Sequence, residues 1–312
     1  MRPSVTGNSG PKFSAPGALD GWNCRRARFE ESWNVMEKTS EYPEELVVYE
    51  CRGDRPPRGE PSGEGFLGLW PEPPFYYLFF DGEAAPEALG WISRQEGWAL
   101  RDVYRLGYAQ WQDLAGGTFQ VGPFAIQCDP SLGAPAAPDG IPIFLKAGVA
   151  FGTGVHPSTK GCLLSLAGLY ERVRPDRVVD MGTGTGILAV ACGRMGASTV
   201  LALDCLPLAI RETRQNIGAN GLEKAVHAVV ADSLNAVRGE ADLLIMNMEW
   251  PCLTKVLREE EWNRFPRVLL SGFLESQWKT IEGLLASFPC RVASRLALDD
   301  WVTALVQNSN FM

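Results

Sequence analysis

Residues 178–188 read VVDMGTGTGIL, and this stretch constrains the fold more than any other part of the chain. A short apolar run ends in an acid, three glycines follow at every second position, and a helix-forming run begins at Ile187. The pattern predicts a buried strand, a tight turn and a helix N-terminus. Glycine supplies backbone angles closed to other residues there and lets a ligand approach main-chain N–H groups. We therefore expect a nucleoside-binding turn.

The spacing of the glycines narrows the class of nucleoside. A dinucleotide fingerprint, G-x-G-x-x-G, would place its third glycine at position 187, which is an isoleucine. The chain instead carries D-x-G-x-G-x-G, made of Asp180, Gly182, Gly184 and Gly186. This pattern resembles motif I of the class I methyltransferases, which bind S-adenosylmethionine.

A second acid supports a nucleoside ligand. Asp204 follows an apolar strand predicted at 199–203, about twenty residues past the glycines, where a carboxylate can accept hydrogen bonds from ribose hydroxyls. The alternative is an ordinary glycine loop with an aspartate that caps a helix. The distance between the two features favours the nucleoside.

The composition is that of a globular protein with about two domains. There is no apolar run of about eighteen residues and no apolar signal-peptide core, so we expect a cytoplasmic protein without a membrane span. The chain has only two histidines and no C-x-x-C pair, which argues against a zinc site and against a disulfide framework. The eight cysteines, at positions 24, 51, 128, 162, 192, 205, 252 and 290, are expected to be reduced and buried.

The first third of the chain is expected to hold a disordered start and a small domain. Residues 1–24 are rich in Gly, Pro and Ser and should be poorly ordered. Residues 1–115 contain 18 acidic and 12 basic side chains, so most of the net charge of −8 lies here. A solvated acidic surface is the commoner explanation of such an excess. If this region recognises anything, a basic partner is favoured over nucleic acid. The predicted N-terminal α+β domain covers 25–115, with strands at 45–50 and 75–80 and a short helix at 86–94.

Residues 116–150 are predicted to connect the domains through two extended runs, 119–128 and 141–146. A catalytic domain is expected over 151–312. It opens with the motif FGTGVHPSTK, in which a proline in the first helical turn predicts a helix that runs to about residue 173.

Several motifs together resemble the PrmA family, bacterial enzymes that methylate the large-subunit ribosomal protein L-eleven. The similarity covers roughly residues 105–307, and the G-T-G-x-H-P-[ST]-T segment is its most specific part. It implies a ferredoxin-like N-terminal domain that holds a protein substrate, followed by a catalytic domain that uses S-adenosylmethionine. The motifs are AFGTGVHPSTKGC at 150–162, VVDMGTGTGILAVA at 178–191, LALDCLPLAI at 201–210, DLLIMNMEW at 242–250 and LLSGFLESQ at 269–277.

From residue 177 onward, predicted strands and helices alternate. This predicts a doubly wound, Rossmann-like α/β sheet that ends in an antiparallel hairpin around Asp299 and Asp300. Ligands of such sheets bind at the carboxyl ends of the strands. Asp232 would lie near the adenine, although an aspartate that caps the next turn is the alternative. The residues expected to bind the cofactor are Thr153, Thr159, Asp180, Gly182, Gly184, Gly186, Asp204, Asp232 and Asn247.

The sequence departs from the PrmA pattern in two places. The N-terminal third shows no clear match to the family's substrate domain. Where the family has N-[IL]-x-A-x-x-L, this chain has NMEWPCL at 247–253, which places Trp250 at the edge of the expected pocket. Both departures concern the substrate and leave the cofactor site intact.

The expected acceptor is an amine, which must lose its proton before it can accept a methyl group. Asn247 could accept a hydrogen bond from the amine and orient it. Asn247, His156 and Trp250 are the candidate catalytic residues, and His156 and Glu249 the candidate bases. For His156 alone, a helix-capping histidine is the better interpretation.

Three hypotheses follow from these residues. The first is a monomeric methyltransferase that modifies lysine or amino groups of a basic ribosomal protein. The second is a methyltransferase acting on another protein or a small molecule. The third, a silent cofactor-binding module, is disfavoured because the glycines, Asp204 and Asn247 are retained.

Overall fold

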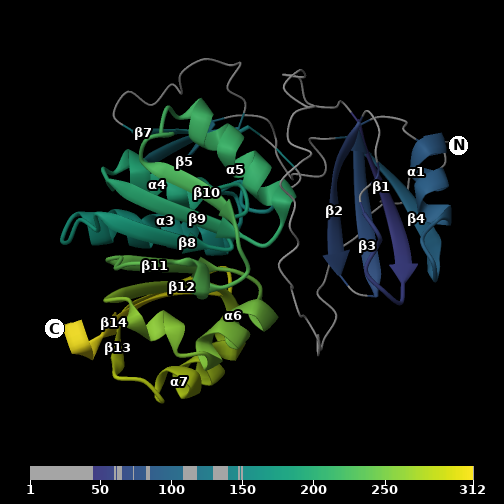
Figure 1. Cartoon of the computed structure of the whole chain (residues 1–312). Helices are drawn as coiled ribbons and strands as arrows, with labels where there is room; N and C mark the ends of the chain where they lie inside the picture. The colour runs from purple at the N-terminus through teal and green to yellow at the C-terminus, as the bar shows by residue number, and fades with distance from the viewer. Residues whose placement is uncertain are drawn as a thin grey trace, which may run out of the picture.

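The computed structural model of the chain describes residues 45–59, 61, 65–72, 74–81, 85–107, 118–128, 140–146, 148 and 150–311, and the predicted disordered start lies outside them. The described strands form a large sheet, a smaller N-terminal sheet and a third sheet of three short strands (Figure 1). Within these ranges no helix has the length and apolar character needed to cross a membrane.

The large sheet has seven strands in the order β10-β9-β8-β11-β12-β14-β13. All neighbouring strands are parallel except those paired with β14, which runs antiparallel to β12 and β13. The strand order reverses on either side of β8, and such a switch point is where doubly wound sheets bind ligands. The predicted fold class is confirmed. The strands are β8 (Arg177–Met181), β9 (Thr199–Asp204), β10 (Val226–Val230), β11 (Leu243–Asn247), β12 (Arg267–Leu274), β13 (Cys290–Leu298) and β14 (Trp301–Asn308).

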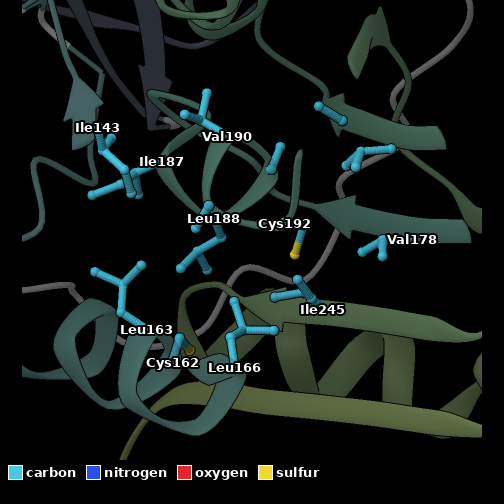
Figure 2. Packing of buried hydrophobic residues seen from close by; sticks show 14 of the residues in the cluster. Ile143, Cys162, Leu163, Leu166, Val178, Ile187, Leu188, Val190, Cys192 and Ile245 are labelled. Carbon is cyan, nitrogen blue, oxygen red and sulfur yellow. The ribbon is translucent and has the colours of Figure 1, made fainter. Parts of the chain in front are cut away.

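Helices cover both faces of the large sheet, because successive strand residues point to opposite sides. Val178 and Ile245 pack into a core that includes α3 (Pro157–Tyr170), α4 (Ile187–Arg194) and α5 (Pro207–Ala219). Their sequence neighbours Val179 and Leu244 pack into a second core on the other face, with α6 (Trp250–Arg258) and α7 (Trp278–Leu285). Figure 2 shows the first core, in which side chains of α3 and α4 lie against Ile245.

The segment predicted to connect the domains is part of the large domain's core. The run expected at 119–128 is a hairpin of β5 (Thr118–Val121) and β6 (Phe124–Gln127), which turns at Gly122 with a positive φ of 54°. β6 pairs in parallel with β7 (Ile141–Phe144). Buried side chains of all three strands pack with α3 and α4.

The N-terminal sheet has the antiparallel order β2-β3-β1-β4, which is that of a ferredoxin-like domain. A helix, α1, lies between β3 and β4. The first helix of that fold has no counterpart in the described residues, where a loop leads from β1 toward β2. The elements are β1 (Glu45–Gly53), β2 (Phe66–Glu72), β3 (Phe75–Asp81), α1 (Ala85–Ser93) and β4 (Trp98–Gly107).

The two faces of this sheet have different neighbours. One face packs on α1 through Trp91 and Ile92. On the other face, Leu46, Val48 and Phe79 pack against Leu208 of α5. The small sheet thus docks on the large domain, and α1 lies on the side turned away from it (Figure 1).

Four of the seven described cysteines are buried, as predicted. The prediction is wrong for Cys205 and Cys252, which are exposed. Cys205 directly follows β9 at the carboxyl edge of the sheet, and Cys252 lies in the first turn of α6.

Candidate functional site

The glycine turn between β8 and α4 adopts the conformation that the sequence predicts. Gly182, Gly184 and Gly186 have φ angles of 74°, 56° and 82°, a region that side-chain-bearing residues rarely adopt. A Cβ on Gly184 would lie 2.3 Å from the Phe151 carbonyl oxygen, and one on Gly186 would lie 2.7 Å from Thr213. The glycines therefore allow other protein segments to approach the turn closely.

All five N–H groups of residues 182–186 donate to acceptors within the protein. The protein itself thus satisfies the N–H groups that the sequence interpretation assigned to a ligand. The N–H groups of Gly182 and Thr183 donate to the Leu203 carbonyl at 2.8 and 2.9 Å, and that of Gly184 donates to Asp204 Oδ2 at 3.0 Å. The Thr185 N–H donates to the Phe151 carbonyl at 3.0 Å, and the Gly186 N–H donates to the Thr183 carbonyl at 2.8 Å.

This arrangement has a consequence for the ligand. A phosphate bound at a helix N-terminus needs free backbone N–H groups that point toward it. In this turn those groups are already paired with the protein. The turn therefore favours a nucleoside that brings no phosphate to this position.

Asp180 lies beneath the turn rather than on its surface. The residue is 1% exposed, and its carboxylate accepts a hydrogen bond from Thr183 Oγ1 at 2.6 Å. Burial raises the pKa of Asp180 to about 6, although hydrogen bonds from Thr183 and the Ala189 N–H act in the opposite direction. Asp180 thus supports the turn and the start of α4 from inside.

Asp204 closes β9 and faces the turn, as predicted. Its Oδ2 accepts from the Gly184 N–H and its Oδ1 from the Leu206 N–H, both at 3.0 Å. Burial raises the pKa of Asp204, while hydrogen bonds from Leu206, Gly184 and Cys205 lower it. A carboxylate has about four acceptor sites, so this one is fixed in orientation and keeps capacity for a hydroxyl donor.

Four buried polar residues lie on one side of α5, and two of them hold the glycine turn; sequence reasoning missed all four. Thr213 Oγ1 donates to the Gly184 carbonyl at 2.8 Å, and Asn216 Nδ2 donates to the Thr185 carbonyl at 2.8 Å. Their helical spacing places them on one side of α5, but a polar side of a helix normally indicates a surface that faces solvent. The four are Glu212, Thr213, Asn216 and, at the C-cap, Asn220.

His156 is the N-cap of α3. Its Nδ1 accepts a hydrogen bond from the Ser158 N–H at 3.3 Å, and its ring lies 4.5 Å from that of Trp301 and 5.8 Å from that of Phe151. Burial, followed by the charge of Lys160, lowers the pKa of His156. The ring is therefore neutral near pH 7, and Nδ1, which would have to take up a proton, already serves as an acceptor.

Asn247 closes β11 and is tied to the first turn of α3. Its Nδ2 donates to Thr159 Oγ1 at 3.3 Å, and Thr159 is 1% exposed. With Nδ2 engaged, Oδ1 is the atom of the amide that can accept a hydrogen bond. Thr159 thus positions Asn247, and Thr153 is likewise buried beside the turn.

The remaining predicted residues lie farther along the strand ends. Asp232 is exposed after β10, and the cap of the next turn is Ser233, whose Oγ accepts from the Asn235 N–H. Trp250 begins α6, is half-buried and packs against the second core. Glu249 precedes it; the residue is exposed, and partial desolvation of its carboxyl group raises the pKa of Glu249. No group of three or more potential metal ligands occurs among the residues that the structure describes.

Comparison with known proteins identifies the family. The family model of "Ribosomal protein L11 methyltransferase (PrmA)" matches residues 120–309, more than half of the chain. The chain belongs to this family. The predicted resemblance to PrmA is confirmed, and the match includes the glycine turn, Asp204 and Asn247.

Relatives and a solved structure agree with this assignment. Ribosomal protein L11 methyltransferases of Shouchella clausii and Symbiobacterium thermophilum are 35% and 36% identical over 180 and 169 residues, which is 55% and 53% of this chain. A crystal structure of the ribosomal protein L11 methylase from Lactobacillus delbrueckii subsp. bulgaricus superposes with a TM-score of 0.56 and 26% identity, covering 62% of this chain and 98% of that one.

The sequence match is confined to one part of the chain. The chain spans about half the length of the curated PrmA relatives it matches: 55% of the Shouchella clausii protein and 54% of the Symbiobacterium thermophilum protein. The matched residues 120–309 start after the N-terminal sheet, which ends at Gly107. PrmA membership thus concerns the large domain, and its chemistry requires a methyl donor.

Proposed function

We propose that this protein is an S-adenosylmethionine-dependent methyltransferase that modifies an amino group of a ribosomal protein. The observation that carries the proposal is the glycine turn, whose N–H groups are satisfied internally while Asp204 faces it. A nucleoside without a phosphate at this point fits those groups, whereas a dinucleotide does not. PrmA membership supports the same ligand.

The residues of the carboxyl edge divide the work of holding this cofactor. Asp204 would accept a ribose hydroxyl, and Asp232 would lie toward the base. Three buried residues would support the site without touching the cofactor's ribose. They would fix the backbone of the glycine turn and the side chain of Asn247, and they are Thr153, Thr159 and Asp180. S-adenosylmethionine supplies a methyl group that its sulfonium has already activated.

Asn247 is proposed to orient the acceptor amine. Its amide is anchored through Nδ2 to Thr159, so Oδ1 can accept an N–H and direct the lone pair of the amine. We do not assign the role of general base to His156, because its Nδ1 already caps α3. Glu249, with its raised pKa, is the remaining candidate for accepting the proton.

We also propose a division of labour between the two domains. The catalytic domain would comprise residues 118–311, which include the β5–β6 hairpin and β7. The sheet at 45–107 would recognise the substrate. The acidic excess of residues 1–115 favours a basic protein over nucleic acid. A ribosomal substrate would place the protein in the cytoplasm, where it would act as a monomer.

The proposal is tested by methyl transfer from radiolabelled S-adenosylmethionine. The substrates are purified ribosomal protein L11 and, in parallel, a lysate of the source cells treated with nuclease. We expect label in one basic protein band. Asn247→Ala should lower the rate of transfer far more than the affinity for the cofactor. Label in a small-molecule fraction alone would contradict the protein substrate.

Trp250 provides a second test at the acceptor side. It stands where the PrmA pattern has a small residue, so its indole should narrow the pocket and disfavour amines that already carry methyl groups. We expect mono- or dimethyl product from the wild type and more trimethyl product from Trp250→Ala, as measured by mass spectrometry. Identical product distributions would leave Trp250 as a packing residue.

A further inference from the structure

The segment that leads into α3 is fastened to α5 by a buried acid. The Ala150 N–H donates to Glu212 Oε2 at 2.9 Å, and Glu212 is 6% exposed. A Cβ on Gly148 would lie 2.0 Å from the same oxygen, so the backbone passes directly against the carboxylate. This acid takes no part in the roles assigned above.

The same segment contacts the glycine turn on its other side. The Phe151 carbonyl accepts from the Thr185 N–H at 3.0 Å, and the Gly152 carbonyl accepts from Thr185 Oγ1 at 2.5 Å. Gly184 has no room for a side chain because the Phe151 carbonyl occupies that space. Residues 150–152 thus lie between Glu212 and the turn.

Ala150 is buried, but packing of the Phe151 side chain does not place this segment. The Phe151 side chain is 67% exposed, the largest value among the exposed large hydrophobic residues of the described chain. Its backbone is placed by hydrogen bonds, on one side to Thr185 and, through Ala150, on the other side to Glu212. A hydrogen bond to a charged acceptor contributes more than a neutral one, so the carboxylate is the stronger anchor.

We propose that Glu212 is a positioning residue for the cofactor site. By holding Ala150, it keeps residues 150–152 against the glycine turn and keeps 184–186 in the conformation that binds the cofactor. Thr213 and Asn216 fasten the same turn from the same side of α5, so the helix holds both segments in one register. The inference rests on the proposed function, since it concerns the affinity of that site for its cofactor.

The test compares Glu212→Ala and Glu212→Gln with the wild type. The matched control is Glu223→Gln, the same change of charge at an exposed position just beyond α5. Affinity for S-adenosylhomocysteine is measured by calorimetry. We expect the dissociation constant to rise about tenfold in Glu212→Ala, because a charge-assisted hydrogen bond is lost. It should rise less in Glu212→Gln, whose amide oxygen still accepts the Ala150 N–H, and stay unchanged in the control.

Two further readouts separate positioning from a general loss of stability. In steady-state kinetics, Glu212→Gln should raise KM for S-adenosylmethionine and leave kcat unchanged. In hydrogen exchange, the Ala150 and Thr185 amides should exchange faster, while β8 keeps wild-type protection. A fall in kcat with unchanged KM, or lost protection throughout β8, would overturn the assignment.

The outcomes also separate this inference from the proposed function. If the wild type binds S-adenosylhomocysteine and both Glu212 variants bind it equally well, the positioning role is wrong and the methyltransferase stands. If the wild type does not bind it, the proposed function fails and this inference fails with it. Should Glu212→Ala not fold, the binding and kinetics of Glu212→Gln decide the question.

Discussion

His156 shows how one residue can serve a motif without acting on the substrate. The G-T-G-x-H-P-[ST]-T segment is the most specific part of the family resemblance, and its histidine is an obvious candidate base. In the structure the ring caps α3 and packs against Trp301. The sequence favoured the cap for this residue alone, and the geometry supports that interpretation.

A substitution that keeps the cap distinguishes the two roles. Asparagine is a good N-cap, so His156→Asn should retain wild-type stability and most of kcat. His156→Ala should lower the free energy of unfolding by about 1 kcal/mol, through loss of the cap. Urea unfolding and steady-state kinetics measure both effects. A fall in kcat of a hundredfold or more in His156→Asn would show that the imidazole takes part in proton transfer.

Asp180 should leave a signature in the pH dependence of stability. Its folded-state pKa of about 6 lies above the ordinary value, so the folded state favours the protonated form. This contribution to stability is present below about pH 4 and is lost as the pH rises through about 6. The loss amounts to about 3 kcal/mol, at about 1.4 kcal/mol for each unit of pKa shift.

A comparison with Asp180→Asn isolates the contribution of Asp180 to the pH dependence of stability. The free energy of unfolding should fall less between pH 4 and pH 7 in the variant than in the wild type. Urea unfolding at several pH values measures the difference, and parallel curves for the two proteins would contradict a raised pKa. Asparagine also places an N–H₂ group near the Ala189 N–H, so a constant loss of stability is expected at every pH.

At the scale of elements, the sequence predicted the large domain well. The strand predicted at 199–203 forms β9 and extends by one residue to Asp204, because both faces of such a buried strand are apolar. The edge strands β2 and β4 were missed. β2 contains Gly68 and Pro71, which are typical of loops, and β4 alternates apolar with charged residues.

The polar side of α5 could not be derived from local pattern alone. Glu212, Thr213 and Asn216 look like solvent-facing residues of an amphipathic helix, yet they are buried because two loops distant in sequence pack there. Only the tertiary structure reveals that these loops are the glycine turn and the segment before α3. The carboxyl ends of the strands were predictable, but the residues that hold the neighbouring loops were not.

The first turns of α5 also join the two domains, which yields a test. Leu208 is buried against Leu46, Val48 and Phe79 of the small sheet. Leu208→Asp should therefore separate the small sheet from the large domain. Large-to-small changes at buried leucines cost about 2 kcal/mol or more, and a charge costs more still. Small-angle scattering should show a larger radius of gyration. Leu89→Asp, on the exposed side of α1, should not change it.

At the scale of the whole molecule, the small sheet and the large domain meet at α5. The large domain carries the PrmA match and the site, whereas the sheet at 45–107 lies before the matched residues. That sheet has the strand order expected of a ferredoxin-like domain, although its sequence did not reveal the family's substrate domain. We therefore expect the large domain to bind the cofactor, and this binding can be measured without knowing the acceptor.

Calorimetric titration of the full chain with S-adenosylhomocysteine and with NAD is the most direct test of the central claim. We predict binding of S-adenosylhomocysteine, no binding of NAD, and an affinity about ten- to a hundredfold weaker in Asp204→Ala, since hydrogen bonds to a charged group contribute about 1.5–3 kcal/mol. Binding of NAD without S-adenosylhomocysteine, or unchanged affinity in a folded Asp204→Ala variant, would contradict the account.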